Sequence, residues 1–499
     1  MDLETAKKDF RDVVEKLHAF QHAMGIMSYD ALTTAPSDSA EGRGKSMGIL
    51  SRYTYDLTAG EKTQQAVAYL KEHLDELDEL TAREVTEFDK RNEYTRSIPA
   101  DEYVRYRMLL NDADAVWHKA KENSDFASFE PLLQEIFDSN KRFAKYYKPD
   151  EDPYDVLLDR YEKGMNKEML DKFFSGLREK IVPLIKQISE KEQIDSDFVN
   201  LAYPIDKQRE FSSYLMDVIG IDKTHCIIGE TEHPFTTGFN KKDVRITTHY
   251  HLNDFTRSMY SVIHEGGHAL YELHAGEKYE GTAIAGGSSM SIHESQSRFY
   301  ENLIGRSREF IGYIFPKLSE IFPEQTAGHT AEDFYRAINK SEPSLIRIYA
   351  DELTYPLHIM VRYEIEKAVM SGKAEVKDLP ELWNEKMKEY LGVDVPDDRN
   401  GVLQDSHWSG GSIGYFPSYA LGSAYGAQML YHMKKDFDVT ADVAKGDISR
   451  VTGWLTERIY QHCRMYDPGD LLKMACGEEF DPHYFTDYLT EKYTDLYDL

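Results

Sequence analysis

The sequence predicts a mainly α-helical protein that carries one small β-sheet. Through most of the chain, apolar residues recur every three to four positions, as they do along one face of a helix. Only residues 224–250 change to β-branched residues with alternating polarity, punctuated by Gly and Pro. No repeat period and no Ser/Gly/Pro-rich linker divides the 499 residues. We therefore expect residues 1–499 to form a single multi-helix domain with two lobes.

The helical pattern starts at the N-terminus. One apolar face of the first predicted helix consists of Phe10, Val13, Val14, Leu17 and Phe20. Long charged helices are predicted over about residues 60–145, with a break at SIPADEY, where Ser97 and Pro99 resemble a helix start.

The sheet is predicted directly before the helix that contains HEGGH, residues 264–268. Within residues 224–250 one set of residues, Val244, Ile246, Thr248 and Tyr250, alternates with Arg245, Thr247 and His249. This alternation is typical of a strand with one polar face. We expect a hairpin or small antiparallel β-sheet, whose edge strand could hold an extended peptide.

Composition excludes several classes of protein. The formal charge is −29, from 59 basic and 88 acidic residues, which disfavours binding to nucleic acid or anionic lipid. No run approaches the roughly 18 apolar residues of a membrane span, and the charged N-terminal stretch lacks the apolar core of a signal peptide. Cys226, Cys463 and Cys476 form no disulfide framework. The expectation is a soluble cytoplasmic protein with reduced thiols.

HEGGH carries the strongest chemical signal. Residues four apart share a helix face, so His264 and His268 can bind one metal ion, while Glu265 can reach a water at that ion. A catalytic zinc takes three protein ligands and keeps one position open. We expect Glu294 as the third ligand, because a Gly/Ser-rich turn lets the stretch that begins SMSIHESQ return as an antiparallel helix. His293 is the rival donor.

Gly266 and Gly267 lie inside the predicted helix. Each costs roughly 1 kcal/mol relative to Ala. We expect them to make room for a substrate backbone or for a close neighbouring helix.

Beyond HEGGH, five further motifs occur in a fixed order: HPF at 233–235, DVRIT at 243–247, HESQ at 293–296, IRIYAD at 346–351 and GVLQDSHW at 401–408. Together they resemble the signature set of the carboxypeptidase Taq family of metallocarboxypeptidases, and the resemblance covers essentially the whole chain. Two departures lie outside these motifs. Lys163 stands where the family has proline, and Tyr29 stands where tryptophan is usual.

The resemblance implies a mostly helical, clam-like fold with a deep groove, a small β-sheet at the cleft, and a homodimer. It also implies metal-dependent release of single residues from peptide C-termini, with broad side-chain specificity and poor activity on proline. Cobalt is commonly accepted in place of zinc, one ion per chain.

A carboxypeptidase must bind a free carboxylate, which arginine does best. Arg347 is the first candidate, although an ion pair with Asp351 four residues on would also explain it. Arg245 is the competitor, and Asp243 could neutralise it. His233 could line the groove or cap the turn before the strand.

Hydrolysis also needs hydrogen-bond donors for the developing oxyanion. The segment 401–426 offers His407, Tyr415 and Tyr419. By similarity to related helical zinc peptidases, which use a downstream His and Tyr, we select His407 and Tyr415. Glu265 is expected to act as general base and then general acid.

Three alternatives have testable differences. An endo-acting zinc oligopeptidase would share the zinc site but would not need a free C-terminal carboxylate. A non-catalytic zinc protein would prefer four ligands, often cysteine, and no cysteine lies near HEGGH. GRGKS, residues 42–46, is not a phosphate-binding loop, because Ser39 replaces its first glycine and no strand precedes it.

Overall fold

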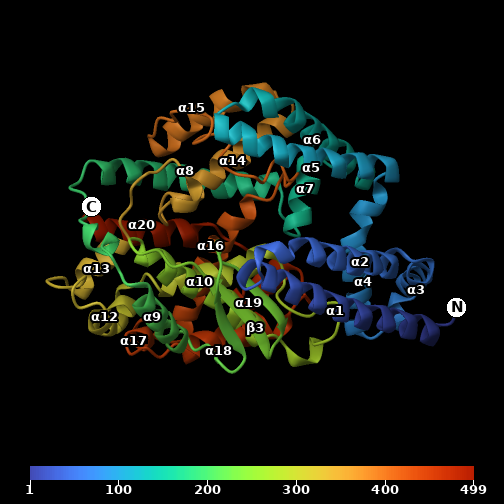
Figure 1. The fold of residues 1–499 in the computed structure, drawn as a ribbon, viewed down its shortest axis with the longest axis horizontal. Coiled ribbons are helices and arrows are strands. Elements are labelled where there is room, and N and C mark those ends of the chain that lie inside the picture. Colours follow the sequence, from blue (N-terminus) through green and yellow to red (C-terminus); the bar gives the residue numbers. More distant parts are fainter.

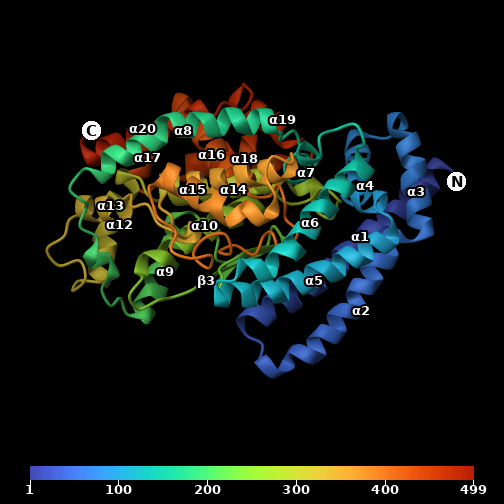
Figure 2. The same ribbon diagram turned by 90° about the horizontal axis from the view of Figure 1, so that it is seen from above.

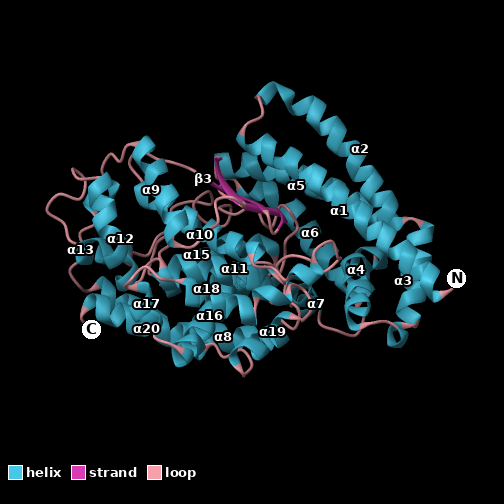
Figure 3. Cartoon of the chain, turned by 90° about the horizontal axis from the view of Figure 1, so that it is seen from below, coloured by secondary structure: helices cyan, strands magenta, loops and turns pink.

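The computed structural model describes residues 1–499 and is mostly helical, with a single three-stranded sheet (Figures 1 and 3). The N-terminal helices lie at one end of the molecule and the C-terminus lies at the other, in views taken at right angles (Figure 2). None of the helices is long and apolar enough to cross a membrane.

The N-terminal end has its own small core. It is formed by helices α1 (Leu3–Thr33), α2 (Ala40–Ala59), α3 (Glu61–Glu72) and α4 (Glu79–Ser97). Four residues of the predicted α1 face are buried as expected, since Phe10, Val13, Val14 and Leu17 pack against Val67, Leu70, Val85 and Phe88 of α3 and α4. The fifth, Phe20, is only half-buried. In contrast, α2 buries none of its residues.

The predicted helices between residues 60 and 145 are also confirmed. After α4 the chain continues through α5 (Ala100–Asn123), α6 (Phe126–Tyr147), α7 (Pro153–Tyr161), α8 (Lys167–Ser189) and α9 (Ile205–Val218). At SIPADEY, Ser97 ends α4 and Pro99 is the N-cap residue of α5. Proline suits this position because it has no N–H to leave unpaired.

The sheet is mixed and not purely antiparallel. Its strands β1 (Cys226–Glu230), β2 (Thr236–Asn240) and β3 (Asp243–Thr248) have the order β1-β3-β2. The β2–β3 pair is the expected antiparallel hairpin. The correction concerns β1, which pairs parallel to β3, with Cys226 opposite Val244. Tyr250 lies beyond the end of β3.

Three helical elements in the centre of the molecule carry HEGGH and its neighbours. Helix α10 (Phe255–Leu273) is followed by α11 (Met290–Arg298), which continues into a π-helical turn, η5 (Phe299–Ile304). His268 contacts His293, whereas the earlier His264 contacts the later Glu301, so α11 and η5 run antiparallel to α10, as predicted. Helix α16 (Pro417–Asp436) packs on the other side of α11.

The remaining helices complete one large apolar core, to which 108 buried residues belong. They are α12 (Arg308–Ile321), α13 (Ala331–Ile338), α14 (Tyr355–Met370), α15 (Leu379–Leu391), α17 (Val439–Val443), α18 (Ser449–Arg458), α19 (Pro468–Cys476) and α20 (His483–Tyr497). The HEGGH helix lies inside this core, with most of its residues buried.

Candidate metal centre and active site

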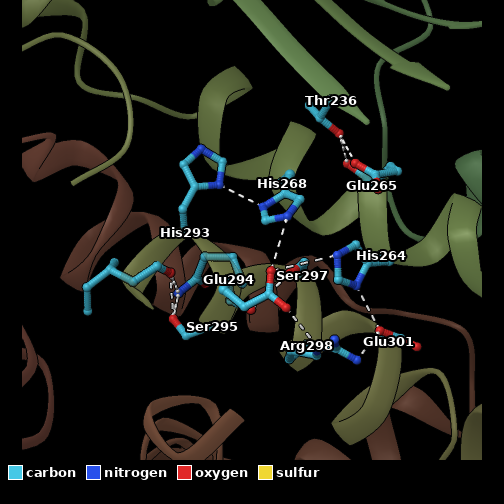
Figure 4. A network of polar contacts seen from close by, with 12 residues as sticks. Thr236, His264, Glu265, His268, His293, Glu294, Ser295, Ser297, Arg298 and Glu301 are labelled. Atoms are coloured by element: carbon cyan, nitrogen blue, oxygen red, sulfur yellow. Dashed lines mark hydrogen bonds and ion pairs between the residues drawn. The ribbon is translucent and has the colours of Figure 1, made fainter. Parts of the chain in front are cut away.

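The three predicted metal ligands converge. Their donor atoms all lie within 4.8 Å of one another. The Oε2 atom of Glu294 is 3.8 Å from Nε2 of His264 and 3.6 Å from Nε2 of His268 (Figure 4). Ligand atoms at about 2.0–2.2 Å from one zinc ion would be about 3.3 Å apart in a tetrahedron. The donor set therefore fits a divalent ion after small side-chain adjustments.

The other nitrogen of His264 is held by Glu301. Oε2 of Glu301 is 2.8 Å from Nδ1 of His264, so the carboxylate can accept the Nδ1–H and leave Nε2 free for a metal. Arg298 lies between the two carboxylates: its Nε donates to Glu294 at 2.8 Å and its Nη1 to Glu301 at 3.3 Å. The π-helical turn η5 brings Glu301 into this position, and such turns are frequent at functional sites.

His268 is held by a second histidine. Its Nδ1 is 2.7 Å from Nδ1 of His293 (Figure 4). On its other side, Nε2 of His293 is 2.8 Å from Oε1 of Glu272. The rival donor His293 thus points its ring at the far side of His268 and not at the converging donor atoms.

The charges around the centre favour a cation. Burial alone would lower the pKa of His264, but Glu294 and Glu301 raise it to about 9. Burial would raise the pKa of Glu301, yet Arg298 and His264 lower it to about 2. Burial, together with His293 and His264, holds the pKa of His268 well below its usual value, so this ring is neutral, as a ligand must be.

Glu265 lies beside the ligands and faces β2. It is 7% exposed, and Oγ1 of Thr236 donates to its Oε2 at 2.6 Å. Burial raises the pKa of its carboxyl group. A buried carboxylate with a raised pKa is suited to accept a proton from a water at the centre.

The two glycines of HEGGH have different neighbours. A Cβ atom on Gly267 would lie 2.6 Å from the backbone oxygen of Gln296, in α11. One on Gly266 would lie 2.3 Å from Cδ1 of Ile219, the end of a flexible side chain. The prediction of a close neighbouring helix is therefore confirmed for Gly267. Its missing side chain allows α11 to bring Glu294 to the histidines.

The N-terminus of α11 is anchored by a buried carboxyl group. Glu162, which follows α7, is 1% exposed. It accepts a hydrogen bond from the hydroxyl of Ser289, the N-cap residue of α11, at 2.9 Å and another from the backbone N–H of Ser291 at 3.3 Å. Because no cation pairs with it, burial raises the pKa of Glu162 to about 7.

His407 and Tyr415 lie together near the centre. Their rings stack with centroids 5.6 Å apart, and Nε2 of His407 is 3.2 Å from the hydroxyl of Tyr419. Burial, with a smaller effect of Arg347, lowers the pKa of His407 to about 4, so its ring is neutral at pH 7. Burial also raises the pKa of Tyr415, and Glu294 is close enough to contribute to this shift.

Arg347 does not pair with Asp351. It begins a short 3-10 turn, not an α-helix, so the i+4 geometry of the alternative is absent. Its Nε and Nη2 atoms donate to Asp405 at 3.2 and 2.9 Å, and Nη1 donates to the hydroxyl of Tyr355 at 3.2 Å. The fully buried Arg362 also pairs with Asp405, at 2.7 Å. Two guanidinium groups thus share one carboxylate, which leaves a net positive charge.

The other two predicted substrate contacts, Arg245 and His233, have different surroundings. Arg245 pairs bidentately with Asp243 at 2.9 Å, and its guanidinium group lies over the rings of Tyr29 and Phe239. Asp243 therefore neutralises the charge of Arg245, as the alternative from the sequence expected. His233 is exposed in the β1–β2 connection and makes no side-chain hydrogen bond with the protein, so it caps no turn.

Several residues around the centre were missed at the level of sequence: Glu301, Arg298, Glu272 and Thr236. A signal existed for the first three. Arg298 follows the ligand Glu294 by one helical turn, and Glu301 follows it by about two, so both lie on the same helix face as Glu294. Glu272 follows the ligand His268 by one turn and shares its face in the same way. Thr236 had no such signal, because its contact crosses from the sheet to α10.

Comparisons with known proteins identify the family of the chain. A sequence model described as Carboxypeptidase Taq (M32) metallopeptidase matches residues 9–493. Carboxypeptidase 1 of Bacillus subtilis is 42% identical over 499 residues, which cover 100% of both chains. Thermostable carboxypeptidase 1 of Pyrococcus furiosus is 37% identical over 487 residues, 96% of each chain.

Solved structures extend the similarity to the fold. The crystal structure of an M32 carboxypeptidase from Deinococcus radiodurans superimposes with a TM-score of 0.95 at 33% identity, covering 99% of this chain and 100% of that one. The match spans nearly the full length, and the converging ligands lie within it. The chain belongs to the carboxypeptidase Taq family of metallopeptidases.

Proposed function

We propose that this protein is a metallocarboxypeptidase that releases single amino acids from peptide C-termini, with broad side-chain specificity and poor activity on proline. The observation that carries the proposal is the convergence of His264, His268 and Glu294 beside the buried carboxyl group of Glu265. Family membership supports the use of a divalent metal ion.

We propose zinc as the resident ion, one per chain, with cobalt able to substitute. Two imidazole nitrogens and one carboxylate oxygen form a typical catalytic zinc set. Bound there, the ion would lower the pKa of water and polarise a peptide carbonyl. Glu301 and His293 would keep the two ligand rings in the required orientation.

Glu265 is the proposed proton carrier. Its carboxylate accepts a proton from the attacking water and then donates it to the leaving amine. Thr236 holds one oxygen of this carboxylate by a hydrogen bond and so fixes its direction.

His407 and Tyr415 are the proposed donors to the oxyanion. Both rings are partly buried, where a hydrogen bond is stronger than in water. Tyr415 is close enough to Glu294 to sense its charge. The neutral ring of His407 still carries one N–H, and Tyr419 occupies its Nε2 side.

Arg347 is the proposed receptor for the terminal carboxylate. The guanidinium group of arginine has five N–H donors, and contacts to Asp405 and Tyr355 use three of them. The net positive charge of the Arg347–Asp405–Arg362 cluster supports binding of an anion. Arg245 and His233 remain secondary candidates for substrate contact.

The proposal extends to the setting of the enzyme. The three cysteines are free and buried, which supports a reducing compartment, and we propose the cytoplasm. Substrates are peptides with a free C-terminus, and the charge of −29 disfavours nucleic acid and anionic membrane surfaces as partners. We retain the single domain with two lobes that flank the groove, and the homodimer implied by the family, which analytical ultracentrifugation tests.

The test is one peptide in two forms, as the free acid and as the C-terminal amide, with products followed by mass. Stepwise loss of single residues from the acid only, stopped by a chelator and restored by zinc or cobalt, is the expected result. Internal cleavage of both forms would instead establish the endo-acting oligopeptidase. Arg347→Gln should raise KM for the acid, and Arg308→Gln, which removes an exposed arginine paired with Glu332, serves as the matched control.

A further inference from the structure

A cavity outside the metal centre lies between the N-terminal helices and the sheet. It has a volume of about 490 Å³ and is bounded by α1, α4, β2 and the segment 272–286. No role has been given to it above. It is large enough for several side chains, and its lining mixes polar and apolar residues.

Two elements connect this cavity to the metal centre. Strand β2 contacts Glu265 through Thr236, and the residues that follow, Thr237 to Lys241, line the cavity. Glu272 also lines it, and the same carboxylate holds His293 behind His268. Since an extended chain advances about 3.3 Å per residue, a peptide that runs along β2 from Glu265 enters the cavity within two to four residues.

Two arginines in the cavity lack an anionic partner. Neither Arg91 nor Arg464 has a carboxylate oxygen within 4.0 Å. Each makes a single side-chain hydrogen bond, and both bonds go to carbonyls of the same loop: Arg91 to Ala283 at 3.2 Å, and Arg464 to Gly287 at 2.7 Å. Four of the five N–H groups on each guanidinium therefore have no protein partner.

The two guanidinium groups also repel each other. Arg91 is exposed at the mouth of the cavity; the protein around its guanidinium group and then the charge of Arg464 lower its pKa, while Glu87, one turn earlier, raises it. An anion between them would remove this repulsion. Glu272 and Glu87 act on the charges of Arg464 and Arg91 from a distance, but neither forms an ion pair with them: Glu272 is bound to His293 and the backbone of Gly287, and Glu87 pairs with Arg83 and Lys90.

The backbone beside Arg464 is strained. Cys463 has φ 48° and ψ −130°, a conformation that favours glycine. Its side chain is 1% exposed, so the fold retains cysteine here despite the strain. This turn directs Arg464 towards the loop at Gly287 and into the cavity lining. Strain of this kind is concentrated at ligand-binding positions.

We propose that Arg91 and Arg464 form a subsite for an acidic side chain of the substrate, two to four residues upstream of the scissile bond. The inference rests on the peptidase activity proposed above and specifies its preferred substrates. Peptides with Asp or Glu at these positions would be cleaved in preference to neutral peptides of the same length.

The direction of the peptide follows from the positions of the charged groups. Arg347, Tyr415 and Tyr419 lie together and line no part of the cavity. If they receive the terminal carboxylate, the upstream residues run the other way, along β2 and over Arg91 and Arg464.

The experiment compares peptides that share one C-terminal residue and differ only in carrying Glu, Gln or Lys at the second, third or fourth position upstream of the scissile bond. We expect kcat/KM to be about 5- to 30-fold higher for Glu than for Gln at one of these positions, as for one or two charge-assisted hydrogen bonds. Arg91→Gln and Arg464→Gln should each reduce this ratio towards one. Lys242→Gln removes the same charge from an exposed neighbour of β2 outside the cavity and should leave the ratio unchanged.

Charge reversal at Arg91 provides a second measurement that leaves Arg464 unchanged, because its bond to Gly287 also holds a loop. Arg91→Glu should abolish the preference for the Glu peptide more completely than Arg91→Gln does, because the new carboxylate offsets the charge of Arg464. A Glu-to-Gln ratio near one in the wild-type protein, or one unchanged in both arginine variants, would overturn the subsite. If the arginine variants lost kcat/KM equally on the Glu, Gln and Lys peptides, the subsite would also be overturned, because the arginines would then bind the terminal carboxylate or only stabilise the fold. If the wild-type protein released no C-terminal residue from any peptide, the proposed activity itself would fail.

Discussion

The spacing between α10 and α11 can be tested with the two adjacent glycines of HEGGH. Gly267→Ala would place a Cβ atom 2.6 Å from the backbone oxygen of Gln296 and 2.8 Å from Cα of Ser297. Both atoms belong to the backbone of α11, which cannot rotate away as a side chain can. Gly266→Ala adds the same atom one residue earlier, against the movable end of Ile219.

The magnitude follows from the distances. To restore an ordinary contact of 3.4 Å from 2.6 Å, the helices must separate by about 0.8 Å. Overpacking of this kind costs about 1–3 kcal/mol, whereas Ala in place of a helical Gly gains about 1 kcal/mol. We expect a net loss of up to about 2 kcal/mol for Gly267→Ala and a change within about 1 kcal/mol for Gly266→Ala. Glu294 moves with α11, and metal sites tolerate about ±0.2 Å, so metal affinity should fall at least tenfold in the first variant only.

Two measurements check this reasoning. Thermal unfolding of the metal-free proteins gives the packing effect, and competition with a chelator of known affinity gives the metal effect. If Gly267→Ala matched Gly266→Ala in both, the close approach of the helices would not set the ligand geometry.

Three further predictions concern carboxyl groups near the centre. Glu265→Gln should retain bound metal but lower kcat by about 10²- to 10⁴-fold; near-normal turnover in a kinetic assay would remove Glu265 from the proton-transfer role. Glu301→Gln should weaken metal binding by about 10- to 100-fold, because a neutral amide orients His264 less well; unchanged affinity in a chelator competition would contradict this. Glu162 has a folded pKa of about 7 against an ordinary value of 4.5, so its contribution to stability is complete below pH 4.5 and is lost as the pH rises through 7, by about 3 kcal/mol. We therefore expect the free energy of unfolding of Glu162→Gln, relative to that of the wild-type protein, to be higher at pH 8.5 than at pH 5 in denaturant unfolding. The same difference at both pH values would refute the assignment.

Local patterns predicted the helices and the pair of histidine ligands, because both depend on the spacing of residues along one helix. His264 and His268 share a face of α10 whatever surrounds them, since the helix period fixes their relation. The β2–β3 hairpin was predictable for the same reason, because a short turn joins strands that alternate in polarity.

Contacts between distant segments were not predictable in this way. The position of β1, parallel to β3, depends on a crossover and on packing against the core, and so the sheet was expected to be antiparallel throughout. The partner of Arg347 was sought four residues away, but it is Asp405, 58 residues further on. Likewise, no local pattern predicts that Arg91 and Arg464 line one cavity.

The sequence by itself determined that two imidazoles and a carboxylate could meet one ion, since their spacings on two antiparallel helices leave few other arrangements. Only the tertiary structure decided which groups support them and what charge surrounds them. Burial and long-range pairing set the pKa values of His264 and Glu301, the neutralisation of Arg245 by Asp243, and the unpaired charge of Arg91 and Arg464. These quantities depend on distances through space and on exclusion of water, which no spacing along the chain records.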